Sequence, residues 1–312
     1  MPEQEQKPLR TRIYIDGYNL YYGCLKNTSL KWLDIVTLFE KHILPSITVL
    51  KDGKPAKFEL LPEAIKFFTA QILPQAAKAD DSVSCQAKYH SALRKKYDGK
   101  IKIIEGYYSM IESKAKIVDV EEPEKWPKYC QETTVWKLEE KQSDVNLALH
   151  AYHDAITGAV DQVIIVTNDT DIGPAMKLIR EHTEVIIGLV VPTKNHERLP
   201  NAELRELAHW TRSHITLVEL AASQLPRVVH GGRDPTVKPD SWYPNQHIFE
   251  QIKSLGILVR GSRASFYKWM NQPNSFFADQ APIDMIETEA GANEVLVYIQ
   301  NYIADKAKEN GL

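Results

Sequence analysis

The stretch VIIVTNDTDIGPAM, from Val163 to Met176, decides the fold of the chain. It begins with an unbroken apolar run, which is typical of a strand that is buried on both faces of a parallel sheet. The run ends abruptly in polar residues that include two carboxylates one residue apart, Asp169 and Asp171. A helical pattern begins at Pro174, so the stretch predicts a buried strand, a polar turn with two acids, and a helix.

Apolar runs of the same kind recur through the first two-thirds of the chain: RIYI before Asp16, IKFFTA from Ile65, IKIIEGYY from Ile101 and VIIGLVV from Val185. Helical patterns alternate with these runs at 31–44, 82–97, 143–156 and 174–182. This alternation predicts an α/β domain with a central parallel sheet and right-handed crossovers. The segment from Ser109 to Glu132 interrupts the alternation, so we predict an insertion or a hairpin beside the sheet.

The composition is that of an ordinary globular protein: 312 residues, of which 43% are hydrophobic and 25% charged. That length is enough for two domains, because single cores rarely grow beyond roughly 250 residues. The formal net charge of −3 excludes a general basic attraction to nucleic acid, so a polyanion would have to be bound locally. The widely spaced cysteines fit a reducing compartment, and no apolar stretch approaches the roughly 20 residues that span a bilayer. We therefore predict a cytoplasmic protein that does not enter a membrane.

The composition changes after Leu220, where a segment rich in proline and glycine predicts a linker at 221–242. Beyond it, helical patterns follow one another at 245–255, 262–271 and 282–301. We therefore predict a small all-helical domain at 243–312. A domain of about 70 residues is marginally stable alone, so we expect it to form a homodimer or to dock on a protein partner.

Four carboxylates are expected to meet at one edge of the sheet. Ligands of open parallel sheets bind outside the carboxyl ends of the strands. Asp16, Asp169 and Asp171 follow their strands there, and the helix that begins near Asp144 can reach the same edge. Carboxylates about 6 Å apart repel by roughly 3 kcal/mol per pair at an effective dielectric constant near 20, so a cation should neutralise them. Oxygen ligands favour Mg²⁺ or Mn²⁺, which can activate water for attack on a phosphate, whereas zinc would call for His or Cys ligands.

Each acid also has a purely structural interpretation. Asp16 could simply end its strand in an Asp-Gly turn. Asp144 could complement the dipole of its helix, and Asp169 with Asp171 could cap the helix that follows them. The pair Asp169 and Asp171 is the hardest to explain as purely structural, because one residue of separation lets both carboxylates converge on one point.

Other polar and aromatic side chains lie beside the acids in the sequence. Asn19 could turn its amide toward the same site. Lys141 could meet a phosphate as a point charge, unless it is only a solvated charge. Tyr18, Tyr21 and Tyr22 could stack on bases, although their helical spacing also fits core packing.

The loop after the Val185 run leaves the sheet at the same edge and carries basic and polar residues: Lys194, Asn195, His196 and Arg198. These residues could contact the phosphates of RNA and so supply the local basic surface that the overall charge lacks. The alternative is an exposed loop that runs into the helix starting at Asn201.

Three motifs occur in order along the first part of the chain: IDGYNL at 15–20, KQSDV at 141–145 and VTNDTD at 166–171. In order and spacing they resemble the NYN domain of the PIN-like ribonuclease superfamily, over residues 12–220. The resemblance implies a Rossmann-like, three-layer PIN/NYN sandwich with a central parallel sheet. It also implies a metal-dependent endoribonuclease that hydrolyses RNA, with these catalytic and metal-binding residues: Asp16, Asp144, Asp169 and Asp171.

The resemblance implies that Asn19 and Thr167 lie near the acids. The side chains expected to contact the substrate are therefore Asn19, Lys141, Thr167, Asn168, Lys194 and Arg198. Asn168 stands where many relatives have glycine, and Ile172 where phenylalanine is frequent. Neither change removes a carboxylate, so the predicted acidic site is intact.

The tail carries a second set of matching positions: Gly261-Ser262-Arg263-Ala264, Trp269, Asn271, Pro273-Asn274, Pro282, Ile286, Gly291 and Val295. They resemble the C-terminal toxin-binding domain of Xre/MbcA/ParS antitoxins, over 243–307. Ala278 and Asp279 stand where a glycine pair is usual, and no helix-turn-helix segment precedes the match, so DNA binding is not implied. What the resemblance implies is a helical docking or dimerisation module, in which residues such as Trp269 also serve the core.

Three other functions remain as alternatives to the metal-dependent ribonuclease. The first is a catalytically silent RNA-binding or regulatory protein that uses its tail for partners. The second is a phosphatase of the haloacid dehalogenase type, whose nucleophile motif is also Asp-x-Asp after a strand. The third is a component of a toxin–antitoxin system, which the tail alone suggests.

Overall fold

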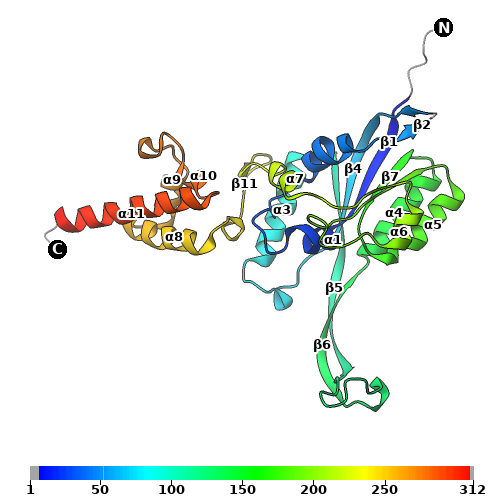
Figure 1. The fold of residues 1–312 in the computed structure, drawn as a ribbon. Helices are drawn as coiled ribbons and strands as arrows, with labels where there is room; N and C mark the ends of the chain where they lie inside the picture. The colour runs from blue at the N-terminus through cyan, green and yellow to red at the C-terminus, as the bar shows by residue number, and fades with distance from the viewer. Residues whose placement is uncertain (1–6, 52, 310–312) are drawn as a thin grey trace, which may run out of the picture. The chain divides into compact units, whose positions relative to one another are not determined.

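The computed structural model describes residues 7–51 and 53–309. The chain divides into two compact units, the first formed by Met1–Lys26 with Trp32–Val237 and the second by Asn27–Lys31 with Lys238–Leu312. Figure 1 shows an α/β first unit and a helical second unit. Among the described residues, no helix combines the length and the apolar character that a membrane span requires.

The first unit is built on a sheet in which the described residues form seven strands, in the order β6-β5-β4-β1-β7-β8-β9. Their bounds are β1 Leu9–Asp16, β4 Phe58–Ala70, β5 Ile101–Lys116, β6 Glu132–Lys141, β7 Gln162–Val166, β8 Ile186–Val190 and β9 Trp210–Arg212. Neighbouring strands are parallel except β5 and β6, which are antiparallel. The predicted α/β class with a largely parallel sheet is confirmed, and each of the five apolar runs lies in a strand.

The helices of the first unit follow the predicted pattern closely. Their bounds are α1 Gly17–Leu20, α2 Ile35–Thr37, α3 Ser82–Lys96, α4 Ser143–Ile156, α5 Gly173–His182, α6 Ala202–Leu207 and α7 Leu217–Ala222. The helix predicted at 31–44 is instead broken into α2, a π-helical turn at Leu38–Ile43 and a 3-10 turn at Leu44–Ser46. In Figure 1, α4, α5 and α6 lie on one side of the strands and α3 lies on the other.

The main core lies between the sheet and α4 and α5. Buried residues of β1 and β7, such as Tyr14 and Ile165, pack with Leu147 and Met176 from these helices. Because β1 and β7 are central and neighbouring strands, their carboxyl ends reach the surface side by side, next to the start of α4. The fold therefore brings the three predicted acidic segments to one edge.

Strands β5 and β6 continue beyond the rest of the sheet as a hairpin arm (Figure 1). Strand β4 accompanies β5 only as far as the pair Ala70 and Gly106, whereas β5 and β6 remain paired from Tyr107 with Lys141 to Lys116 with Glu132. A Cβ atom at Gly106 would lie 2.2 Å from the Lys141 carbonyl oxygen, so glycine is needed where the arm leaves the sheet. The interruption predicted at 109–132 is this hairpin.

The stretch predicted as a linker, 221–242, contains two short strands, β10 Val228–Val229 and β11 Thr236–Val237, which pair with each other. The Lys95 ammonium group of α3 donates to the Thr236 hydroxyl at 2.8 Å, which ties β11 to the first unit. The boundary between the two units lies after Val237.

The second unit is helical, with α8 Gln246–Arg260, α9 Arg263–Met270, α10 Pro282–Met285 and α11 Glu289–Glu309. Its core contains Phe249, Ile252, Phe266 and Val295, all of them fully buried. Helix α8 ends at Gly261, whose φ of +75° suits glycine, and the Ser262 side chain accepts from the Ser265 N–H to begin α9. The predicted C-terminal helical region is confirmed.

Candidate functional site

Asp16 is the last residue of β1 and the N-cap of α1, and its carboxylate accepts four hydrogen bonds. Oδ1 accepts from the backbone N–H groups of Tyr18 at 3.1 Å and Asn19 at 2.9 Å. Oδ2 accepts from the Asn19 amide at 2.6 Å and from the Thr167 hydroxyl at 2.9 Å. The predicted neighbours Asn19 and Thr167 therefore do contact Asp16. The pKa of Asp16 is raised, chiefly because the carboxyl group is buried. The hydrogen bonds from Asn19 and Thr167 lower the pKa, but they do not cancel the effects of burial and of the nearby Asp169 charge.

Asp144 is the second residue of α4 and is the most perturbed acid of the site. Burial and the neighbouring carboxylates of Asp16, Glu140, Asp169 and Asp171 raise the pKa of Asp144 to about 6. The charges that act on Asp144 thus include those of the other three predicted acids. A carboxyl group with such a pKa exists in both protonation states near neutral pH, as acid–base catalysis requires.

The position of Asp144 is fixed by the residue before it. The Ser143 N–H donates to the Glu140 carboxylate at 3.2 Å, and the buried Ser143 hydroxyl donates to the Thr69 carbonyl at 3.1 Å. These bonds hold the start of α4 against the carboxyl end of β4. Glu140 lies in the hairpin arm, so its part in the site could not be expected from the strand–helix alternation.

Asp169 and Asp171 follow β7, as predicted. The Asp169 carboxylate accepts from the Asp171 N–H at 3.1 Å and so caps the 3-10 turn Thr170–Ile172. The Asp169 N–H in turn donates to the Thr167 hydroxyl at 3.1 Å, and that same hydroxyl donates to Asp16. The pair is therefore both a cap and part of the acidic site, because Thr167 links the two strand ends.

Two of the residues predicted to bind a substrate are engaged with their own surroundings. The Lys141 ammonium group pairs with Glu139 on the exposed arm. The Asn168 side chain donates to the Leu199 carbonyl at 3.1 Å and accepts from the Asn201 N–H at 2.8 Å. Asn168 therefore fixes the loop before α6 to the end of β7, a structural role that asparagine can fill and glycine cannot.

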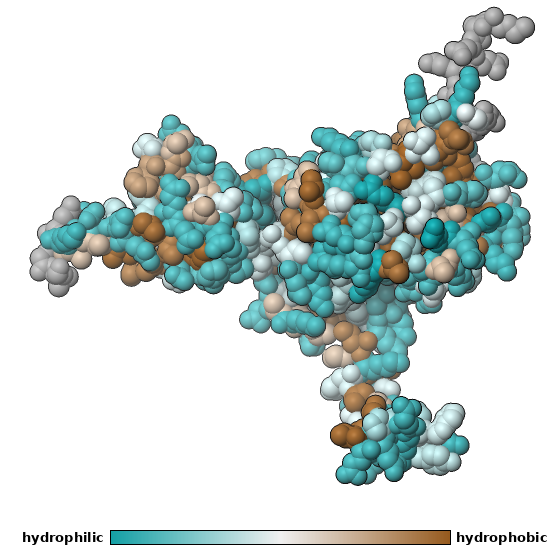
Figure 2. Space-filling model, viewed as in Figure 1, coloured by the Kyte–Doolittle hydropathy of each residue, from teal (hydrophilic) through white to brown (hydrophobic). Residues whose placement is uncertain are grey.

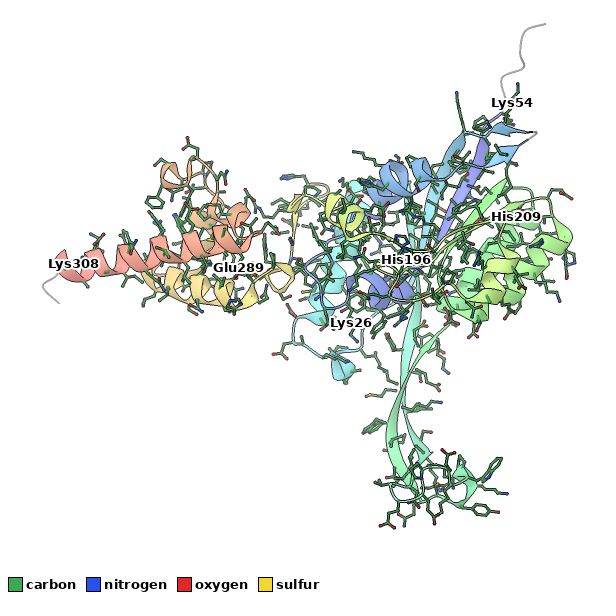
Figure 3. The ribbon with its side chains drawn as sticks, in the orientation of Figure 1. Lys26, Lys54, His196, His209, Glu289 and Lys308 are labelled. Atoms are coloured by element: carbon green, nitrogen blue, oxygen red, sulfur yellow. The ribbon has the colours of Figure 1, made fainter. Side chains whose placement is uncertain are left out.

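The basic loop after β8 packs close to the same edge. The Lys194 ammonium group lies 3.8 Å from the Glu197 carboxylate, and the Arg198 N–H donates to the Thr193 hydroxyl at 3.1 Å. The Arg198 guanidinium forms no ion pair within residues 7–51 and 53–309. The imidazole rings of His196 and His214 lie 3.5 Å apart, and Figure 3 shows His196 in the central part of the first unit.

A group of tyrosines adjoins the acids. The Tyr18 ring stacks on Tyr22, with the ring centroids 6.4 Å apart, and meets Tyr108 edge to face at 5.7 Å. The Tyr18 hydroxyl donates to the Ala70 carbonyl at 2.8 Å, while about half of Tyr22 is exposed. Tyr18 thus has a structural role, whereas the half-exposed Tyr22 ring also lies under the Lys26 ammonium group, which is 4.8 Å from the ring centroid. Tyr108 was not expected here, since it lies at the base of the arm.

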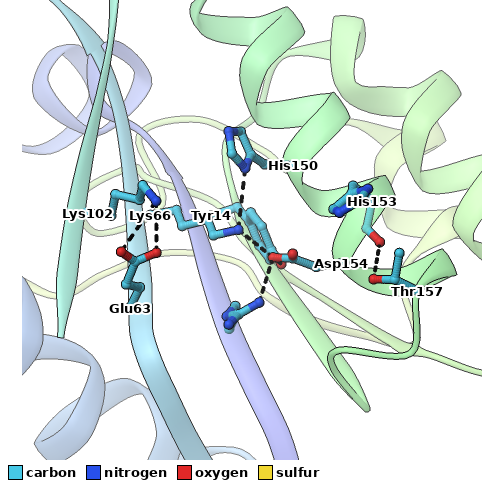
Figure 4. A network of polar contacts seen from close by, with 9 residues as sticks. Tyr14, Glu63, Lys66, Lys102, His150, His153, Asp154 and Thr157 are labelled. Carbon is cyan, nitrogen blue, oxygen red and sulfur yellow. Dashed lines mark hydrogen bonds and ion pairs between the residues drawn. The ribbon is translucent and has the colours of Figure 1, made fainter. Parts of the chain in front are cut away.

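A second polar network is buried between the sheet and α4 (Figure 4). The Asp154 carboxylate accepts from Lys66 and from the Tyr14 hydroxyl, both at 2.6 Å, and lies 3.1 Å from the Arg12 guanidinium. Burial raises the pKa of Asp154, but the bonds from Lys66 and Tyr14 and the charges of Lys66 and Arg12 outweigh it, so that the pKa is lowered. The carboxylate is held by side chains of β1 and β4, so the network anchors α4 to the sheet, although the buried Arg12 Nε has no hydrogen-bond partner among the described residues.

A cavity of about 430 Å³ lies at the opposite edge of the sheet. Apolar residues of β4, such as Leu60 and Leu61, line it together with Lys100 and Glu40. The Lys100 ammonium group lies 3.0 Å from the Glu40 carboxylate, so these two charges of the cavity pair with each other.

The chain is an α/β protein with acidic and aromatic side chains gathered at the carboxyl edge of its sheet, and it carries a small helical unit after the sheet. Residues 254–301 match the model of the antitoxin Xre/MbcA/ParS C-terminal toxin-binding domain, which confirms the resemblance of the tail. The whole chain is similar to the 6-hydroxy-3-succinoylpyridine 3-monooxygenase HspA of Pseudomonas putida, with 57% identity over 304 residues that cover 97% of each protein. The chain belongs to the family of this monooxygenase.

One solved structure is a weak match. It is a protein of unknown function from Vibrio parahaemolyticus, which is 15% identical and gives a TM-score of 0.35 over 68% of this chain and 96% of that one. A likeness of this size does not define the fold.

The predicted metal-dependent endoribonuclease is wrong. The relative that matches along nearly the whole chain is a monooxygenase, not a hydrolase of RNA. Ribonuclease, endonuclease and hydrolase are therefore incorrect descriptions of the chain. The physical reason is that acids at the end of a parallel sheet locate a ligand site without specifying which bond is made or broken there.

The prediction of a Mg²⁺ or Mn²⁺ cofactor is also wrong, since it rested on the ribonuclease activity and the matching relative is a monooxygenase. In addition, no group of three or more His, Cys, Asp or Glu side chains in residues 7–51 and 53–309 is placed to hold a metal ion. The electrostatic cost of the acid cluster is instead reduced in two ways: four hydrogen bonds to Asp16, and a pKa of Asp144 that lets this carboxyl group take up a proton.

Aromatic oxygenases commonly use a flavin, and doubly wound sheets hold dinucleotides at the turn after the first strand. There a pyrophosphate needs free N–H groups at a helix start and glycines that let the backbone approach. Here the Asp16 carboxylate already accepts from the N–H groups of α1. A Cβ atom at Gly17 would lie 2.7 Å from the Phe68 carbonyl oxygen, and one at Gly23 only 1.8 Å from that of Pro192. These glycines allow close packing of the protein, so this turn does not fit a dinucleotide.

Proposed function

We propose that the chain is a monooxygenase whose substrate is a hydroxylated pyridine with an acyl carboxylate side chain. The observation that carries this proposal is the 57% identity with the 6-hydroxy-3-succinoylpyridine 3-monooxygenase over 97% of both proteins. The overall reaction takes O₂, two electrons and two protons; one oxygen atom enters the substrate and the other leaves as water. The electrons come from a reduced nicotinamide in solution.

The acidic and aromatic edge is the proposed substrate site. The exposed part of the Tyr22 ring, beside the Lys26 ammonium group, suits contact with a flat heteroaromatic ring, since pairing of aromatic rings contributes about 0.5–1.5 kcal/mol. Asp144, whose pKa is raised to about 6, can donate to or accept from the ring nitrogen and hydroxyl of such a substrate. We assign it the role of holding or moving the proton at these atoms.

Basic side chains near the edge suit the carboxylate of the substrate. Arg198 lies in the loop that reaches the end of β7 through the bond between Asn168 and the Leu199 carbonyl. A guanidinium group binds a carboxylate through two parallel hydrogen bonds. We therefore assign Arg198 to the acyl carboxylate, with Lys194 beside it.

The test uses the full chain with 6-hydroxy-3-succinoylpyridine, a reduced nicotinamide and ¹⁸O₂, with and without added flavin. We expect one ¹⁸O atom in the product and one in water. We also expect Asp144→Asn to lower kcat about 100-fold or more, in line with the usual size of general acid–base effects. Asp80→Asn, which changes an exposed carboxylate in the same unit, is the matched control and should keep full activity.

Two outcomes would contradict this proposal. If the wild-type chain incorporates no ¹⁸O with any flavin, the reaction class is wrong. If it does so and Asp144→Asn is fully active, the oxygenase stands but the site is wrong, and the cavity lined by Leu60 and Leu61 becomes the place to mutate.

We further infer that the first unit has the PIN-like NYN arrangement within its α/β class. Support comes from the three acidic segments after β1, at the start of α4 and after β7. One fold can host unrelated chemistries, so an oxygenase on this scaffold raises no physical conflict. A crystal structure in which the carboxylates of Asp16, Asp144 and Asp169 do not converge would contradict the inference.

For the second unit we infer a docking role, supported by the match of residues 254–301 to a domain named for toxin binding. Leu258 and Phe276 are large apolar residues that lie mostly exposed on this unit. Size-exclusion chromatography of the full chain mixed with a toxin whose antitoxin carries this domain tests the role. Separate elution of the two proteins would count against it.

A further inference from the structure

Glu139 and Glu140 are neighbouring carboxylates at the base of the arm formed by β5 and β6, and their surroundings differ. Glu139 forms ion pairs with Lys137 and Lys141. Within residues 7–51 and 53–309, Glu140 forms no ion pair. Successive side chains of a strand point to opposite faces, so Glu140 points away from both lysines. The charge of Glu140 is therefore not neutralised on the arm.

The strand register places Glu140 beside the acidic and aromatic edge. Glu140 pairs across the arm with Tyr108, whose ring meets that of Tyr18 edge to face at 5.7 Å. The next row on the same face is apolar and pairs Met110 with Leu138, and Figure 2 shows further hydrophobic residues along the arm. On this face of the arm, Glu140 is therefore the carboxylate that lies nearest the sheet.

A single residue in an unfavourable conformation connects the arm to α4. Strand β6 ends at Lys141 and α4 begins at Ser143, and Gln142 between them has a φ of +78°, in the left-handed region that favours glycine. Such a conformation persists where surrounding contacts fix it. The Gln142 side chain makes no capping bond to α4. Glu140 Oε1 accepts from the Ser143 N–H at 3.2 Å instead, so the arm supplies the cap of this helix.

The Glu140 carboxylate is packed as well as bonded. A Cβ atom at Gly106 would lie 3.1 Å from Glu140 Oε1 and 3.0 Å from Ser143 Oγ, so both side chains lie directly over the Gly106 backbone. The Ser143 hydroxyl donates to the Thr69 carbonyl at the end of β4. The base of the arm, the end of β4 and the start of α4 are thus held together, and Asp144 is the next residue of the helix.

The charge of Glu140 also acts on Asp144. The pKa of Asp144 is raised to about 6, first by burial and then by the four carboxylates that face it. They come from the ends of β1 and β6 and from the turn after β7: Asp16, Glu140, Asp169 and Asp171. The effect of Glu140 is larger than that of Asp169 or Asp171. Glu140 thus reaches Asp144 by its charge as well as by its hydrogen bond.

We propose that Glu140 is the positioning residue of Asp144: as a hydrogen-bond acceptor it fixes the start of α4, and as a second carboxylate it favours the protonated form of Asp144. This inference rests on the catalytic role proposed for Asp144 and extends the site to the arm. A protonated carboxyl group can donate a hydrogen bond to a nitrogen or oxygen of a hydroxylated pyridine, whereas a carboxylate can only accept one. The base of the arm thereby takes part in setting the proton inventory of the site.

Two substitutions separate the two effects. Glu140→Gln keeps an oxygen acceptor for the Ser143 N–H and removes the charge, whereas Glu140→Ala removes both. Glu139→Gln removes a charge from the adjacent residue on the opposite face and is the matched control. Values of kcat and KM are measured for the full chain with 6-hydroxy-3-succinoylpyridine and a reduced nicotinamide from pH 5 to pH 8. Far-UV circular dichroism shows whether each variant is folded, and the nearly isosteric Gln variant decides the test if the Ala variant is not.

We expect Glu140→Ala to lower kcat on the order of 100-fold with little change in KM, because a small misplacement of a catalytic group has a cost of this size. Glu140→Gln should recover most of this kcat at its own pH optimum. Its pH profile should nevertheless move to lower pH, because the like charge beside Asp144 is gone. Glu139→Gln should change neither kcat nor the profile. A purely structural role of Glu140 would not move the profile.

A second measurement needs no turnover. Carboxyl ¹³C NMR follows the titration of Asp144, whose signal is identified by its absence from Asp144→Asn. We expect the midpoint to be lower in Glu140→Gln than in the wild type and unchanged in Glu139→Gln. A titration that does not move in Glu140→Gln, or a folded Glu140→Ala with the kcat of the wild type, would overturn the proposal. If the wild type does not oxygenate and the titration still moves, the proposed reaction fails while the link between Glu140 and Asp144 stands.

Discussion

Helix α4 carries two aspartates that the fold treats in opposite ways. Asp154, in the interior, accepts from Lys66 and Tyr14 and lies beside Arg12, and its pKa is lowered. Asp144, at the helix start, faces other carboxylates, and its pKa is raised to about 6. The same residue type therefore serves stability where its charge is satisfied, and has a raised pKa where it is not, which fits the catalytic role proposed for Asp144. Perturbed pKa values without a compensating partner are a mark of functional sites.

The largest effect on stability should come from removing Asp154, the carboxylate whose charge is satisfied. We expect Asp154→Ala to lower the free energy of unfolding by about 3–5 kcal/mol, because it leaves the buried Lys66 ammonium group without its partner. Urea denaturation at pH 7 measures this change. The double variant Asp154→Leu with Lys66→Met should lose less, since it removes both buried charges. Equal losses in both variants would show that packing, and not charge, governs the network.

The fold was largely predictable because its strands and helices follow simple periodic rules. The apolar runs lie in strands, and the helix predicted at 143–156 has the bounds of α4, since its apolar face repeats at helical spacing. The meeting of Asp16, Asp144 and Asp169 followed from the rule that ligand sites lie at the carboxyl ends of parallel strands.

The rest of the site depends on contacts between residues that are distant in the sequence. Tyr108 reaches Tyr18 only because β5 extends past β4, and no local pattern reports that extension. The bonds of Asn168 to the loop at Leu199 and Asn201 are equally non-local. The monooxygenase activity of the relative could not be foreseen from these residues, because carboxylates are compatible with hydrolysis and with oxygenation alike.

Replacing Asn168 tests whether a polar group with all its hydrogen bonds made contributes to stability at the edge of the sheet as Asp154 does in the interior. Both ends of its amide are used, so Asn168→Ala should cost about 1–3 kcal/mol for two lost hydrogen bonds. The loop before α6 should then exchange its amide hydrogens faster, while kcat changes little. Hydrogen exchange of residues 199–204 measures the loosening. A variant that keeps wild-type stability but loses kcat would instead place Asn168 among the residues that contact the substrate.

The smallest effect, and the one most specific to the comparison, is the pH dependence of stability from Asp144. Its folded pKa is raised above that of an ordinary aspartate, so its favourable contribution is fully present at pH values below about 4 and is lost as the pH rises through about 6. Asp144→Asn removes this loss. Because Asp144 is partly exposed and screened by solvent, we expect the variant to gain only on the order of 1 kcal/mol at pH 8, or about 2–4 °C in Tm, and nothing at pH 4.

Thermal unfolding of the wild type and Asp144→Asn across this pH range is the measurement, with Asp80→Asn as the control for loss of one exposed charge. A gain for Asp144→Asn that is the same at pH 4 and pH 8 would mean that this carboxyl does not titrate in the window, and the contrast with Asp154 would fail. A gain of stability confined to the higher pH, together with lost oxygenation, would show that Asp144 lowers the stability of the fold while Asp154 raises it.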